Sequence, residues 1–115
     1  MAGVELASAT GVEQVRAELH ARIAAIGATI DRRARRVSAR DLAPEIDAIR
    51  LLAHRAGMAP AVTVAHFIDS ALSRGERGAL VHGWLTMLRD AVGSERQDLD
   101  AAHAFAAACS VRLSS

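Results

Sequence analysis

The chain has 115 residues, a formal net charge of +1, 51% hydrophobic residues and 3% aromatic residues, so it has room for about one small domain and no second core. Its single cysteine, Cys109, excludes an internal disulfide and a four-thiolate zinc site, and it is typical of a reducing compartment. Because there is no signal-peptide pattern and no apolar run of about 18 residues, we expect a soluble, cytoplasmic protein without a membrane segment.

The amino-acid usage favours helix over sheet. Alanine occurs 26 times, leucine 11 times and arginine 14 times, whereas valine, isoleucine, phenylalanine, tryptophan and tyrosine together total 18. We therefore expect residues 1–115 to form one all-α domain. The expected architecture is a compact bundle of about five helices, with a long N-terminal helix and a central apolar helix.

The first expected helix follows residues 1–9, which are small and unpatterned and which we expect to be flexible. Thr10 precedes Glu13 by three positions, as in a capping box, so we place the helix start there. Apolar residues then recur about every 3.6 positions, which predicts a straight amphipathic helix with Gly27 as its weak point. These residues are Val12, Val15, Leu19, Ile23, Ile26, Ile30, Ala34 and Val37.

A second helix is expected at about 42–56. Ser38 can cap it, Pro44 is typical of a first turn, and Gly57 can adopt the left-handed conformation that ends many helices. The sequence therefore predicts a break in the chain after the first helix.

A third helix is expected at about 60–74, between Pro60 and Gly75. Its residues are apolar nearly all round, which is typical of a central buried helix. We expect the other helices to pack around it.

The fourth expected helix ends near Gly93 and carries Trp84 as the largest core side chain. A second capping box, formed by Ser94 and Gln97, would start the fifth helix. In that last helix Cys109 lies on an apolar face among alanines, so we expect it to be a packed thiol and not a nucleophile.

The first expected helix is much longer than the other four. At about 1.5 Å per residue the first helix would span about 40 Å, and the others about 20 to 25 Å. Either the first helix breaks near Gly27, or the apolar residues at its C-terminal end are covered by another chain. We favour a symmetric homodimer. The expected interface comprises Ile23, Ile26, Ile30, Ala34 and Val37.

An arginine cluster is the sharpest local feature, with five arginines in nine residues: Arg32, Arg33, Arg35, Arg36 and Arg40. The planar guanidinium group of arginine can donate two parallel hydrogen bonds to a phosphate. The cluster is therefore a candidate anion or nucleic-acid site. The alternative is that these cations complement a helix C-terminus and pair with nearby carboxylates. We favour this alternative, because the net charge is low and no aromatic residues interleave the cluster.

The expected third helix carries one polar strip, formed by Thr63, His66, Ser70 and Ser73. Buried polar groups need partners, so we expect the strip to bond to a neighbouring helix or to line a small pocket. Catalysis by a serine and a histidine is not favoured, because no glycine-flanked turn presents the serine.

Five histidines are spread over the expected helices, which raises two further alternatives. A metal site could use His66, Asp69, Asp100 and His103, but the spacing of di-iron sites is absent, so we expect no metal and no cofactor. Histidine phosphotransfer could use His54, but Pro60 would break the continuous helix that such a site needs.

The sequence names no activity. We expect a non-enzymatic interaction or regulatory module that acts as a homodimer and binds a protein partner. The alternatives are an anion or nucleic-acid binder that uses the arginine cluster, and a metal-binding or phosphotransfer-like helical bundle.

Overall fold

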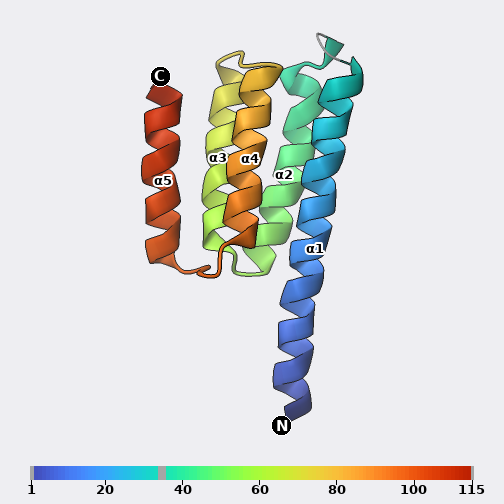
Figure 1. Ribbon diagram of the computed structural model, residues 1–115, viewed down its shortest axis with the longest axis vertical. Helices are drawn as coiled ribbons and strands as arrows, with labels where there is room; N and C mark the ends of the chain where they lie inside the picture. Colours follow the sequence, from blue (N-terminus) through green and yellow to red (C-terminus); the bar gives the residue numbers. More distant parts are fainter. Residues whose placement is uncertain (1, 34–35, 115) are drawn as a thin grey trace.

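In the computed structural model of this protein, the described part of the chain forms five helices (Figure 1). The structure describes the backbone of residues 2–33 and 36–114 and the side chains of residues 11–33 and 36–114. Within these residues there is no β-strand, which confirms the all-α class. The helices are α1 (Ala2–Arg33), α2 (Ala39–Arg55), α3 (Ala59–Ser73), α4 (Ala79–Gly93) and α5 (Leu99–Ser114).

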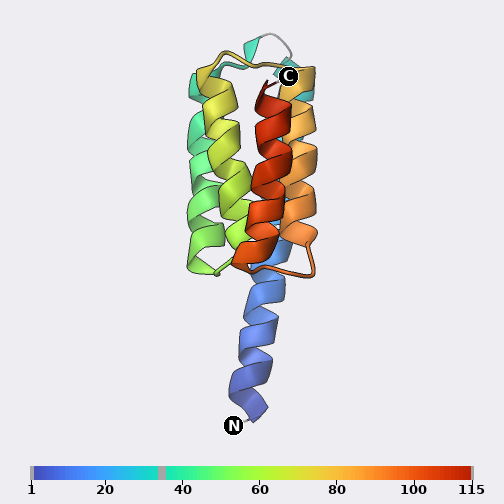
Figure 2. The same ribbon diagram turned by 90° about the vertical axis from the view of Figure 1, so that its left-hand side faces the viewer.

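Helix α3 is the centre of the bundle, as its apolar sequence predicts. It packs against α2, α4 and α5, while α1 packs against α2 and α4 (Figures 1 and 2). Burial of the α3 side chains against three neighbours removes apolar surface from water, at about 25 cal/mol for each Å². The buried residues of α3 are Pro60, Ala61, Val64, Ala65, Ile68, Ala71 and Leu72.

The helix boundaries on either side of α3 follow the local sequence. Pro60 occupies the first turn of α3, where its missing N–H costs no hydrogen bond. Gly57 and Gly75 have φ angles of 71° and 89°, in the left-handed region that glycine adopts without a steric penalty. These two residues end α2 and α3, as predicted.

A capping box starts α2 three residues earlier than we expected. The Asp41 backbone N–H donates to Ser38 Oγ at 3.3 Å, and the Ser38 N–H donates to Asp41 Oδ2 at 3.0 Å. As a result Pro44 lies inside α2, not in its first turn.

The two capping boxes that we expected do not start helices. Helix α1 already runs through Thr10, from Ala2 to Arg33, without a break at Gly27. Before α5, the Gln97 amide nitrogen donates to the backbone oxygens of Ala91 and Ser94, and α5 begins at Leu99. Asp98 is its N-terminal acceptor, because its Oδ1 accepts from the Ala101 N–H at 2.9 Å.

The expected dimer interface on the first helix is wrong in its location. Ile23, Ile26, Ile30 and Val37 are all buried in the core of the single chain, and Ala34 lies outside the described residues. The surplus length of α1 extends from the other end of the bundle, where its N-terminal part projects past the remaining helices (Figures 1 and 2). The sequence indicated that about half of the first helix would extend past the other helices, and we expected this to be the C-terminal half. The structure has the surplus at the N-terminal end (Figure 1).

The buried position of Ile30 makes a clear prediction. Because only 4% of Ile30 is exposed, Ile30→Glu would place an unpaired carboxylate in the core and should lower the free energy of unfolding by about 4 kcal/mol or more. Urea unfolding followed by circular dichroism at 222 nm measures this change. The control is Ala28→Glu, an exposed position on the same helix. A folded Ile30→Glu protein with unchanged stability would contradict the buried position.

Candidate functional site

The N-terminal arm, which we define as residues 2–14 of α1, is the part of the molecule that leaves the bundle. The molecule measures 52 × 29 × 17 Å along its principal axes, and α1 with 32 residues accounts for about 48 Å at 1.5 Å per residue. Contact with the core begins at Val15, whereas Val12 is 37% exposed.

Arg16 fixes α1 to α4 at the point where the arm begins. Its Nε donates to the Val92 carbonyl oxygen at 3.0 Å, and its Nη1 contacts Glu13 Oε1 at 2.8 Å. The first contact joins residues 76 positions apart and ties the end of α4 to α1. The arm therefore extends from an anchored point.

A groove runs between α1 and α4, with a volume of about 370 Å³. We call it the α1–α4 groove. Its floor includes Ile23 and Leu85, and its rims carry His20, His82 and Arg89. The His82 Nε2 atom lies 2.9 Å from Asp31 Oδ1, which links the two helices at one end of the groove. We did not predict this groove, because its histidines are 62 positions apart in the sequence.

The arginine cluster lies where α1 is connected to α2, at the end of the bundle away from the arm. Its described members, Arg32, Arg33, Arg36 and Arg40, are all exposed, and Arg35 lies outside the described residues. The pKa of Asp41 is lowered by its hydrogen bonds with Ser38 and, to a smaller extent, by the charges of Arg33 and Arg40. Two of the cations thus act on a local carboxylate.

Of the two outcomes that we expected for the polar strip of α3, bonding to a neighbouring helix does not occur among the described residues, and only Thr63 lines a pocket. His66 and Ser73 are exposed, and the hydroxyls of Ser70 and Ser73 donate to the His66 and Asp69 carbonyl oxygens of their own helix. Thr63 contributes to a separate pocket, which lies between α3 and the start of α5. Among the residues with described side chains, no polar or charged residue is buried.

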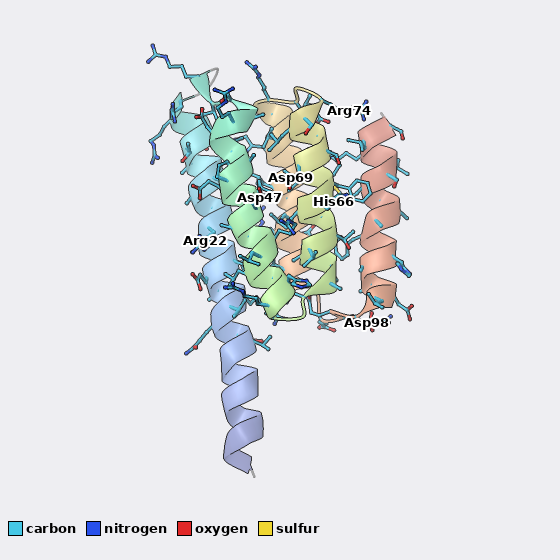
Figure 3. All side chains as sticks on the ribbon, turned by 180° about the vertical axis from the view of Figure 1, so that it is seen from behind. Arg22, Asp47, His66, Asp69, Arg74 and Asp98 are labelled. Carbon is cyan, nitrogen blue, oxygen red and sulfur yellow. The ribbon has the colours of Figure 1, made fainter. Side chains whose placement is uncertain are left out.

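Asp69 forms a carboxyl pair with Asp47 across the contact of α2 and α3 (Figure 3). Desolvation, the hydrogen bond with Asp47 and the negative charge of Asp47 raise the pKa of Asp69 to about 6, while Arg50 and His66 act in the opposite direction. A sequence motif could not have indicated this pair, because it depends on how α2 and α3 are aligned.

The residues that we considered for a metal site are dispersed. Asp100 lies 3.7 Å from the Arg96 guanidinium, while His103 and the exposed His54 line the pocket near the start of α5. In the described part of the chain no three metal-ligating side chains come together.

The contact of α4 with α5 is built around Trp84. The Arg112 guanidinium lies over the Trp84 ring at 5.2 Å and donates to the Leu80 carbonyl oxygen at 3.1 Å. A Cβ at Gly83 would overlap that guanidinium, so the absence of a side chain there makes room for Arg112. Burial raises the pKa of the Cys109 thiol to about 11, in agreement with its expected packing role.

Comparison with protein-family models, with curated proteins and with solved structures found no match to this chain. Of the helices that the structure describes, none combines the length and the apolar character needed to cross a membrane.

The carboxyl pair predicts that stability depends on pH. The folded protein binds the Asp69 proton with a pKa of about 6, against 3.8 for an unperturbed aspartate, so stability should fall as the pH rises from about 4 to 6 and stay lower above that range. Asp47→Asn removes the negative partner and should raise the melting temperature above pH 6, with little effect near pH 4.

Thermal unfolding at several pH values between 4 and 8 checks this prediction. Asp90→Asn, which removes an exposed carboxylate of α4, serves as the control. If Asp47→Asn and Asp90→Asn changed the melting temperature equally at every pH, the pairing of Asp47 with Asp69 would be refuted.

Proposed function

We propose that this protein is a small, non-enzymatic interaction module that associates with a second copy of itself through the N-terminal arm. The observation that carries the proposal is the length of α1 beyond the bundle: the arm projects past the other four helices (Figures 1 and 2).

The arm extends a helix that the bundle already nucleates, but a helical segment without packing is only marginally stable in water. Isolated helices of fewer than about 12 to 15 residues are marginal, and most helix stability in proteins comes from packing. Gly11 weakens the arm further, by about 1 kcal/mol relative to alanine, and a Cβ at Gly11 would meet nothing within 4 Å. Packing against a partner would stabilise the arm, whose backbone projects past the other helices (Figures 1 and 2).

The apolar residues of α1 extend from the bundle into the arm. Val12, Val15 and Leu19 continue the spacing of the buried isoleucines toward the N-terminus, and their exposure increases in that direction. Leu19 is fully buried, Val15 packs at the edge of the core and Val12 is exposed. The row of residues that faces the core thus runs past the end of the bundle.

Charge and symmetry also favour association through the arm. Glu13 is paired with Arg16, so the exposed Val12 lies beside a carboxylate that already has a cationic partner. A two-fold axis through the arms would place each Val12 near the partner arm, and two-fold dimers are the commonest oligomers of soluble proteins. The arms and not the buried isoleucines would then form the interface.

Size-exclusion chromatography with light scattering tests the proposal. We expect a mass of about 24 kDa for the protein, twice the 12.1 kDa of one chain. Val12→Glu should place a charge in the interface and weaken dimerisation at least about tenfold, which corresponds to about 1.4 kcal/mol. The matched control is Ala17→Glu, which adds the same charge at an exposed position about 140° further round the helix.

Two results would overturn the proposal: a monomer at concentrations of about 100 µM, or equal dissociation of the dimer by both variants. Repeating the run at high salt separates this proposal from its alternative, nucleic-acid or anion binding by the exposed arginine cluster. An apolar interface barely responds to salt, whereas a phosphate-driven complex weakens steeply and carries excess absorbance at 260 nm.

A further inference from the structure

The α1–α4 groove collects imidazole and guanidinium side chains, two of which have no partner elsewhere in the described part of the chain. His20, His82 and Arg89 line it, and among the described residues no carboxylate does. In the described part of the chain, the side chains of His20 and Arg89 have neither a hydrogen-bond nor an ion-pair partner. His20 and Arg89 therefore offer donors that no acceptor among the described residues satisfies, whereas His82 already contacts Asp31.

Small residues keep the groove open between these donors. Ala24 and Gly27 lie on the α1 side and Thr86 on the α4 side. A Cβ at Gly27 would lie 3.7 Å from His82 Cε1, so it would just touch that ring, and any larger side chain there would extend into the space beside it. Gly27 thus weakens the helix but leaves room beside His82.

The three donors are spread along the groove. His82, Thr86 and Arg89 follow one another at helical spacing on one face of α4. On α1, His20 precedes Gly27 by seven residues, or about 10 Å. His20 lies near the end of α4, because a Cβ at Gly93 would be 3.9 Å from its Nε2, and His82 lies opposite Gly27. A ligand that contacts all three donors must carry negative charge over several ångströms.

We propose that the α1–α4 groove binds a diphosphate group. Linked phosphates present several charged oxygens in a row, and an arginine fork with two imidazoles can donate to them at separate points. The volume of about 370 Å³ lies within the range of small-molecule sites, about 300 to 1,000 Å³. The chain has 14 arginines and no lysine, so arginine and histidine are the side chains that can bring positive charge to a phosphate.

Asp31 opposes an anion in this groove. Its Oδ1 lies 2.9 Å from His82 Nε2, so it occupies a nitrogen that a phosphate would use, and it brings negative charge to that end. No other carboxylate contacts the three donors within the described residues. Removing the Asp31 charge should therefore tighten binding.

Titration calorimetry of the full chain with inorganic pyrophosphate at low salt tests this site. We expect a Kd below about 1 mM, weakened at least about fivefold by Arg89→Gln and by His20→Gln, because each removes a charged or polar donor. Asp31→Asn should tighten binding about twofold or more, an effect that a purely structural role of Asp31 would not give. Orthophosphate should bind more weakly, and ADP shows whether a nucleotide adds to the diphosphate contacts.

Two exposed arginines outside the groove provide matched controls: Arg55→Gln at the end of α2 and Arg36→Gln in the arginine cluster. Both variants should bind pyrophosphate as the unmodified protein does. Absence of binding up to about 10 mM, or loss of binding in Arg36→Gln with Arg89→Gln unaffected, would overturn the assignment. Arg89→Gln should leave the oligomeric mass unchanged, so this test is independent of the arm.

Discussion

Burial of α3 is the constraint on which the rest of the arrangement depends. A helix that is apolar nearly all round must be covered on several sides, and α2, α4 and α5 together provide that cover. With α3 enclosed, α1 packs onto α2 and α4. The four shorter helices have 15 to 17 residues and set the length of the bundle, so the arm, residues 2–14 of the 32-residue α1, lies outside it.

The sequence predicted the elements whose boundaries depend on local chemistry. Pro60, Gly57 and Gly75 marked helix ends through backbone restrictions that act within a few residues. The same reasoning was wrong at the two expected capping boxes. Thr10 could cap a helix but lies inside one, and Gln97 could complete a capping box but bonds instead to the end of α4. At Thr10 the helix continues through the motif, and at Gln97 the side chain contacts the end of α4 and does not cap α5.

The candidate sites were less predictable, because each depends on the axial alignment of helices. Helical periodicity places Ile30 on an apolar face, but whether that face meets α2 and α4 or another chain depends on how far α1 is shifted along them. The same shift brings His82 to Asp31 and opposite Gly27. Asp47 meets Asp69 for a similar reason, through the alignment of α2 with α3. A pattern read along one helix contains no information about such alignments.

The position of Trp84 also gives the molecule a built-in optical probe. Trp84 is the only tryptophan and the chain has no tyrosine, so emission excited near 295 nm comes from one fully buried ring on α4. That ring contacts Arg112 of α5 and stacks with Phe67 of α3 at 6.5 Å. Far-ultraviolet circular dichroism averages over all five helices, whereas this fluorescence senses the surroundings of one side chain. Detachment of α5 alone would therefore change the emission while most of the helical signal remained.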